Sequence, residues 1–153
     1  MRVRMIAGAA LVAALSAGCG ARAAGPRPAA TPAAATGTVV KVVRSQFGRI
    51  LADGRGQALY YFSRENGRAS RCYGACARAW PPVPAHARPI AGRGARAGLI
   101  GTTRRRDGRR QLTYAGHPVY LYVGDSPGRV LCHDVTEFGG VWRVIRGDGS
   151  VVR

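Results

Sequence analysis

The chain has few of the residues and motifs that enzymes use for catalysis. Its 153 residues include only seven acidic side chains, against 24 basic ones. It contains no H-E-x-x-H metal motif and no G-x-x-x-x-G-K-[ST] phosphate-binding loop. We therefore expect a protein that is not an enzyme and that carries no cofactor.

Other absences exclude further classes. Lys41 is the only lysine, so nearly all of the net charge of +17 comes from arginine, a bias that GC-rich codon use also produces. There is no C-x-x-C redox pair and no C-x-x-C-H haem attachment sequence. No recognition helix and no aromatic-basic RNA motif is present, so nucleic acid is not an expected partner.

The N-terminus has the pattern of a bacterial lipoprotein signal. Two arginines precede an apolar stretch, residues 5–15, which is too short for a bilayer span of about 20 residues. Small residues then lead to Cys19. We expect residues 1–18 to be a signal peptide and lipid on Cys19 to anchor the exported protein to the membrane, at the outer face of the cell membrane or in the envelope. The alternative is an ordinary secretory signal cut after Ala23.

The rest of the chain divides into a tether and one domain. Residues 19–37 are rich in Ala and Pro without apolar periodicity, so they predict a flexible tether. Residues 38–153 contain runs of β-branched and aromatic residues that predict strands. These runs are 38–43, 58–62, 109–114, 119–123 and 141–145.

Turns and one helix connect the predicted strands. Asp107-Gly108 lies between two strand-like segments and predicts a hairpin. A short helix is expected near residues 72–79, ended by Pro81 and Pro82. Residues 86–98, with several Arg, Pro and Gly, are expected to form a loop.

The domain contains an internal repeat. Residues 51–65 resemble residues 112–125, with an offset of about 60 residues in the printed sequence. Cysteine and tryptophan follow in both cases. The predicted fold is therefore mainly β, with two similar β-rich units at about 47–83 and 104–150 whose apolar faces pack as one small domain.

Three motifs carry a family resemblance. Residues 120–125 fit Y-x-(F/W/Y)-x-x-D, residues 72–82 read C-x-x-x-C-A-x-x-W-P-P, and residues 138–142 read F-G-G-x-W. Together they make the chain similar to the bacterial lipoproteins named for the first motif, also described as secreted repeats of unknown function. The resemblance covers about 47–150 and implies an extracytoplasmic location and a repeat fold. It brings no catalytic residues, and in the first unit Glu65 stands in place of Asp.

The cysteines suggest a disulfide. An exported protein meets an oxidising environment, and Cys72 and Cys76 on one helix face would place their Cα atoms about 6 Å apart. Cys132 could instead bridge to either of them. One alternative is thiol redox exchange, and another is a copper or zinc site of these three cysteines with a histidine (His133, His117 or His86).

The motif tyrosines allow two interpretations. Tyr120 and Tyr122 lie two residues apart, so on a strand they share one face and would form a platform for a ring-shaped ligand. In the other interpretation both rings pack in the core and Asp125 belongs to a turn.

The predicted hairpin concentrates positive charge. It carries five arginines, Arg104, Arg105, Arg106, Arg109 and Arg110. Such a cluster favours contact with anionic headgroups or acidic wall polymers, and its alternative is an ordinary solvated face. The sequence identifies no protein partner.

Overall fold

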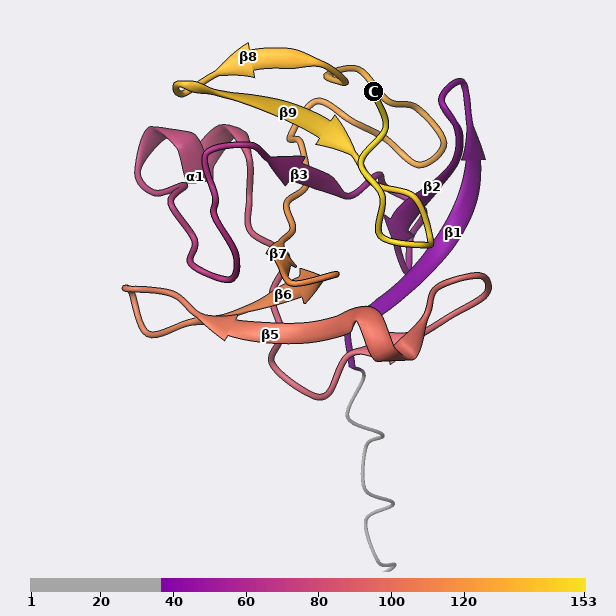
Figure 1. Ribbon diagram of the computed structural model, residues 1–153, viewed down its shortest axis with the longest axis horizontal. Helices are drawn as coiled ribbons and strands as arrows, with labels where there is room; N and C mark the ends of the chain where they lie inside the picture. The colour runs from indigo at the N-terminus through magenta and orange to yellow at the C-terminus, as the bar shows by residue number, and fades with distance from the viewer. Residues whose placement is uncertain (1–36) are drawn as a thin grey trace, which may run out of the picture. The chain divides into compact units, whose positions relative to one another are not determined.

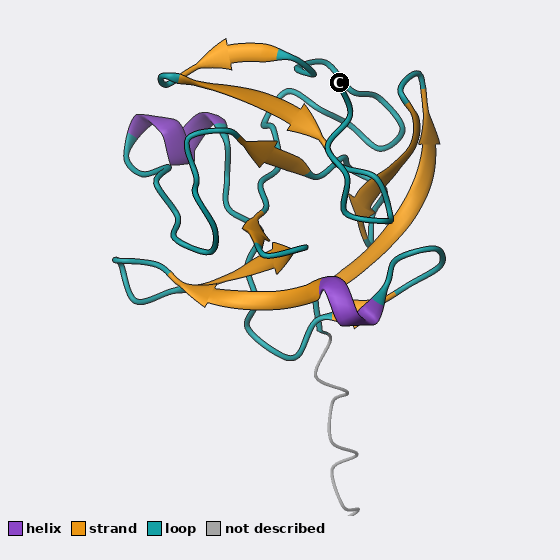
Figure 2. Cartoon of the chain, in the orientation of Figure 1, coloured by secondary structure: helices purple, strands orange, loops and turns teal. Residues whose placement is uncertain are grey.

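The computed structural model describes residues 37–153 (Figure 1). The predicted signal peptide, Cys19 and nearly all of the predicted tether lie in residues 1–36, outside the described part. Among the described residues, no helix is long and apolar enough to cross a membrane. The expected fold class is confirmed: strands and loops dominate, and helix is confined to two short segments (Figure 2).

The strands form three three-stranded sheets. The first has the order β2-β1-β4, the second β3-β9-β8 and the third β5-β6-β7. In Figure 1 β1 and β2 of the first sheet lie on the right, β8 and β9 lie at the top, and β5 lies at the bottom. The bounds are β1 Val39–Ser45, β2 Gly48–Asp53, β3 Tyr60–Phe62, β4 Ile90–Ala91, β5 Ile100–Arg104, β6 Arg110–Tyr114, β7 His117–Pro118, β8 Val135–Glu137 and β9 Gly140–Val144.

A β-hairpin stands at the start of each unit, with its first strand ahead of the positions near 47 and 104 at which the repeat begins in the sequence. In the first unit β1 and β2 pair antiparallel, from Val40↔Asp53 to Ser45↔Gly48. In the second unit β5 and β6 pair antiparallel up to Arg104↔Arg110, so the hairpin predicted at Asp107-Gly108 is confirmed.

The C-terminal part of each unit packs on the other unit. β9, from the end of the second unit, pairs with β3 of the first through Tyr60↔Val144. Correspondingly, the first unit's Pro82 forms a bridge with Tyr120 of the second. The backbone bonds agree: Leu112 donates to the carbonyl of Val83 at 2.9 Å, as Leu51 does to Ile145 at 2.7 Å. The two units are therefore interleaved.

Three segments differ from the sequence-based expectation. Only Tyr120 of residues 119–123 takes part in β-bridges, because the neighbouring Pro81 and Pro82 have no N–H with which to extend a ladder. The helix α1 spans Ala75–Ala79, so Cys72 precedes it. Residues 86–98, expected as loop, include the two residues of β4 and the start of the 3-10 helix η1, Ala97–Leu99.

The interior contains two apolar clusters. The first gathers the tryptophans with β3, and the second gathers Leu51, Leu59 and Leu112 with Tyr114. Both draw residues from both units, so the core depends on the two units being together.

Candidate functional site

The motif residues form two pairs that cross between the units. The Tyr60 hydroxyl, in the first unit, donates to Oδ2 of Asp125 in the second at 2.6 Å. The Tyr120 hydroxyl, in the second unit, donates to Oε1 of Glu65 in the first. Tyr60 and Tyr120 also exchange two backbone hydrogen bonds, of 2.9 and 3.1 Å. The motif therefore joins each tyrosine to the acid of the other unit.

The two acids have equivalent backbone partners. The N–H of Arg71, six residues after Glu65, donates to Glu65 Oε1 at 2.8 Å. The N–H of Leu131, six residues after Asp125, donates to Asp125 Oδ1 at 2.9 Å. Burial raises the pKa of both carboxyl groups above their ordinary values, and it also raises the pKa of both tyrosines.

Tyr120 and Tyr122 do not form an open ligand platform. Both rings face the same side, as expected, but that side is the core. Tyr120 is fully buried and lies edge-on to Trp142, with ring centroids 5.3 Å apart. Tyr122 is half-buried and lies 4.7 Å from Trp80.

The tryptophans form the centre of an aromatic column. Trp80 and Trp142, one from each unit, are stacked with centroids 4.0 Å apart and planes at 5°. Phe62 stacks on the other face of Trp142, also at 4.0 Å. The indole N–H of Trp80 donates to Oε2 of Glu137 at 2.9 Å. These contacts bury both tryptophans and Phe62 within the fold.

Arg105 corrects the interpretation of the arginine hairpin. The sequence predicts that it contacts polyanions together with the four other arginines, but its side chain is only 1% exposed. It donates to Gln111 Oε1 at 2.7 Å and to the carbonyl of Cys72 at 2.6 Å. It also donates to Ser70 Oγ at 2.6 Å. Arg105 therefore links the two units from inside and is not free to bind a polymer.

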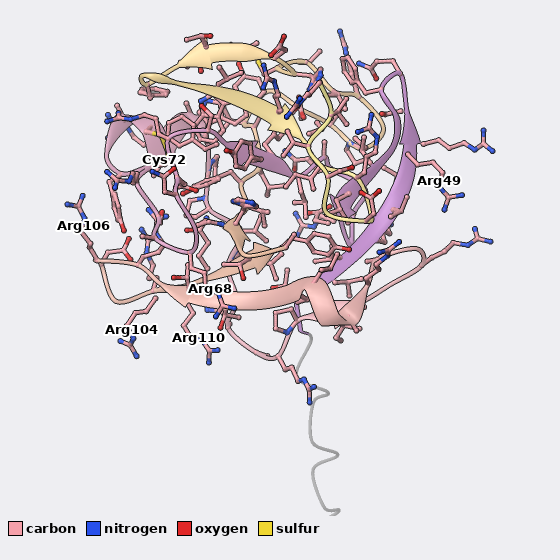
Figure 3. All side chains as sticks on the ribbon, in the orientation of Figure 1. Arg49, Arg68, Cys72, Arg104, Arg106 and Arg110 are labelled. Atoms are coloured by element: carbon pink, nitrogen blue, oxygen red, sulfur yellow. A yellow bond between two sulfur atoms is a disulfide. The ribbon has the colours of Figure 1, made fainter. Side chains whose placement is uncertain are left out.

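The other hairpin arginines are exposed. Arg109 pairs with Asp107 at 2.6 Å, and its side-chain hydrogen bond lowers the pKa of that carboxyl to about 2. The guanidinium of Arg106 lies 4.1 Å from the ring centroid of Tyr73. Arg104, Arg106 and Arg110 point outward from the β5–β6 hairpin (Figure 3).

The structure resolves the choice among the cysteines. Cys72 and Cys76 form a disulfide with their Cα atoms 5.2 Å apart, and Cys132 is free among the cysteines of residues 37–153. Cys132 stands 60 residues after Cys72, at the equivalent place in the second unit. Four residues further on, where the first unit has Cys76, the second has Thr136. The missing second cysteine explains why Cys132 has no bridge within its own unit that would match Cys72–Cys76.

The alternative copper set is not assembled. The disulfide engages two of its four residues, Cys72 and Cys76. Nδ1 of His133, a third member, accepts the N–H of Val144 at 3.3 Å. Among residues 37–153, no group of three or more His, Cys, Asp or Glu side chains is placed to hold a metal ion.

One segment of the chain matches a catalytic motif in its residue spacing only. Residues 124–128 read G-D-S-P-G, which fits the spacing G-x-S-x-G of a nucleophile turn. In the structure Ser126 accepts the N–H of Arg129 through its carbonyl, in a turn that no helix follows. The Asp125 beside it is engaged with Tyr60. The strand-turn-helix setting that such a nucleophile needs is therefore missing at this segment.

A second group of arginines lies outside the motifs that the sequence offers. Arg44, Arg49 and Arg93 line a hollow of about 550 Å³ beside β1, together with Val42 and Val43. Arg93 lies far from the other two in the sequence, and the N–H of Val42 bonds to its carbonyl at 2.8 Å. No local sequence signal could have grouped them, because the pairing of β1 with the segment around β4 brings them together.

Comparison with known proteins identifies both units as repeats. Two segments, residues 41–84 and 101–146, match the sequence model of a family described as a secreted repeat of unknown function. The two matched segments contain both tyrosines and both acids of the crossed pairs. No curated protein and no solved structure matches the chain.

Proposed function

The chain belongs to this family of secreted repeats, and on that premise we propose that it is a lipid-anchored, non-enzymatic binding module that contacts an anionic component of the cell envelope. The observation that carries the proposal is the imbalance between exposed arginines and acids that could neutralise them. The lipid anchor at Cys19 lies outside the described residues and rests on the sequence pattern.

The acidic side chains are occupied within the fold. Two accept tyrosine hydroxyls and one accepts an indole N–H, as described above. Two more pair with arginines, and the last two accept N–H groups in turns. These are Glu65 and Asp125, Glu137, Asp107 and Asp134, and Asp53 and Asp148.

Most arginines therefore face solvent without an acidic partner. In the described part only Arg105, Arg109 and Arg143 make salt bridges. Like charges at such density repel one another, and an anionic ligand relieves the repulsion. The surface thus favours anionic headgroups or polymers over neutral or cationic partners.

The residues of the crossed pairs are hydrogen-bonded to one another within the fold, which supports a binding role over catalysis. Both tyrosines of the crossed pairs are fully buried, and their hydroxyls are held by carboxylates. The stacked tryptophans are likewise closed to solvent. Function in this proposal therefore resides in the charged surface, and the motif maintains the fold that carries it.

Two measurements test the proposal. Replacing Cys19 with Ala should move the protein from the membrane fraction to the medium, and retention in the membrane would contradict the anchor. The released chain should then be retained on a polyanionic matrix at low salt and elute as the salt rises. Retention that does not weaken with salt would contradict the electrostatic contact.

A further inference from the structure

Five arginines line two adjoining hollows beside β1. The hollow of about 550 Å³ lined by Arg44, Arg49 and Arg93 adjoins a second of about 240 Å³ that Arg96 and Arg146 line. The two hollows share Val42 and Arg49. We call the combined feature the arginine groove, and its residues are Val42, Val43, Arg44, Arg49, Arg93, Gly94, Arg96, Arg146, Gly147 and Asp148.

Two glycines let the walls of the groove approach β1. A Cβ on Gly94 would lie 2.9 Å from the Cβ of Val42, and one on Gly147 would lie 2.7 Å from Val42 Cγ2. Gly94 also has a φ of +76°, which favours glycine. Arg93, Arg96 and Arg146 lie within two residues of these glycines in the sequence. The close packing of the glycines on Val42 therefore fixes the backbone positions from which the three arginine side chains extend.

A buried hydroxyl fixes two walls together. Tyr114 is fully buried, and its hydroxyl accepts the N–H of Arg96 at 2.9 Å. The same hydroxyl donates to the carbonyl of Gly147 at 2.6 Å. Since Gly147 follows Arg146, Tyr114 is a positioning residue for two arginines. Tyr114 thus ties two segments of the groove to the core of the protein.

The groove carries a large excess of positive charge. Among the described residues, none of its five arginines makes a salt bridge. Its one acid is Asp148, whose pKa is lowered by hydrogen bonds from Ser150 and, to a smaller extent, by the charges of Arg96 and Arg146. Asp148 is therefore ionised at neutral pH, and one carboxylate faces five guanidinium groups.

Guanidinium groups contributed by three separate segments suit a chain of phosphates. Their planar forks match the oxygens of phosphate in a bidentate manner, and several such contacts in a row select a ligand with repeated charge. A concave groove admits a linear chain, whereas a membrane surface is flat and meets protruding groups. We propose that the arginine groove binds a linear phosphodiester polymer of the cell envelope. This inference rests on the proposed function, because it takes the chain to be exported.

The test compares two variants that lose the same charge. The groove variant carries Arg44→Gln, Arg49→Gln and Arg96→Gln, and no side chain among these three makes a hydrogen bond in the structure. The control carries Arg104→Gln, Arg106→Gln and Arg110→Gln on the β5–β6 hairpin. Figure 3 shows Arg49 beside β1 and β2, well apart from the three hairpin arginines. Both variants are made in the full chain carrying Cys19→Ala.

The probe is a glycerol-phosphate polymer, and binding is measured by titration calorimetry at low salt. We expect the groove variant to bind at least about tenfold more weakly than the parent and the control to change by less than about threefold. Equal weakening of both would overturn the groove while leaving the proposed function intact. Failure of the parent to bind any polyanion would overturn both.

A second arm distinguishes the source of the phosphate. Vesicles of phosphatidylglycerol and phosphatidylcholine are compared with the polymer at equal phosphate concentration. Tighter binding to the polymer, lost in the groove variant, supports the proposal, and tighter binding to vesicles overturns it. Thermal unfolding checks that both variants fold. If the groove variant does not, the pair Arg44→Gln and Arg49→Gln replaces it, with Arg104→Gln and Arg106→Gln as its control, and the same outcomes apply.

Discussion

The hydroxyl of Tyr60 donates to the carboxylate of Asp125 at 2.6 Å across 65 residues of sequence. The equivalent bond, from Tyr120 to Glu65, runs in the opposite direction between the same two units. The motif tyrosine and the motif acid are therefore partners, but each finds its partner in the other repeat. Each unit therefore contains both a motif tyrosine and a motif acid, but these two residues of the same unit do not bond to each other.

The two crossed bonds should differ in strength. Tyr120→Phe leaves the carboxylate of Glu65 without its hydroxyl donor, and Glu65 is only 2% exposed. We expect a loss of about 2–3 kcal/mol in the free energy of unfolding. Tyr60→Phe affects Asp125, which is half-buried, so water can replace the donor and we expect a loss of about 1 kcal/mol. Urea unfolding at neutral pH measures both. Equal losses, or a larger loss for Tyr60→Phe, would contradict this ranking.

The buried acid predicts a pH effect of definite sign. Burial raises the pKa of Glu65 above its usual value of 4.5, and this effect exceeds those of its hydrogen bonds and of Arg105. The folded protein therefore retains the Glu65 proton at a pH where the unfolded chain has lost it. The stability of the parent relative to Glu65→Gln should consequently fall as the pH rises from about 4.5 through the folded pKa. Urea unfolding of both proteins across this range gives the difference. A difference that stays constant or grows with pH would show the opposite shift.

The cysteines predict both a stability change and a thiol count. Removing the bridge with Cys72→Ala and Cys76→Ala should lower the free energy of unfolding by about 2 kcal/mol in the chain-entropy model, since the closed loop is short. The native full chain with Cys19→Ala should show one thiol. Burial raises the pKa of Cys132, so its labelling should accelerate as the pH rises.

Metal analysis of the same sample addresses the copper alternative. Three titratable thiols in the native protein, or stoichiometric copper, would contradict the disulfide and favour the set of Cys72, Cys76, Cys132 and His133. Cys132→Ala serves as the matched control, because it removes the thiol and leaves the bridge.

The interleaved strands predict that neither repeat folds alone. A fragment of residues 37–98 lacks β9, which pairs with β3, and it also lacks Trp142, which stacks on Trp80. A fragment of residues 99–153 lacks the segment around Pro82 that bonds to Tyr120. Circular dichroism should show each fragment without a cooperative unfolding transition, and an equimolar mixture should regain one. Cooperative unfolding of either fragment by itself would contradict the interleaving.

Local patterns in the sequence predicted much of the fold. The hairpin at Asp107-Gly108, the helix ended by two prolines and the repeat near 60 residues all depend on short-range or periodic signals. The crossing of the units was not predictable in this way, because the pairing of Tyr60 with Asp125 has no local counterpart in the sequence. The strand predicted at 119–123 is longer than the one observed. Its own residues favour a strand, and the prolines that interrupt the pairing lie elsewhere in the sequence.

The charged residues also include some features that the sequence predicts and others that only the fold determines. Arg104, Arg105 and Arg106 are consecutive and identical, so only the register of the hairpin decides that Arg105 points inward to Gln111 and Ser70. The arginine groove gathers residues from the β1–β2 hairpin, the segment 93–96 and the turn after β9. Composition predicts an anionic partner, and only the fold places the surface that we propose for it.

The most direct test of the account is the salt dependence of polymer binding. The full chain with Cys19→Ala is titrated with the glycerol-phosphate polymer at several salt concentrations, and the logarithm of the binding constant is plotted against that of the salt. We predict a negative slope that becomes shallower by about 2 in the Arg44, Arg49 and Arg96 variant and stays unchanged in the Arg104, Arg106 and Arg110 variant. Identical slopes for the parent and the groove variant would contradict a binding site in the groove.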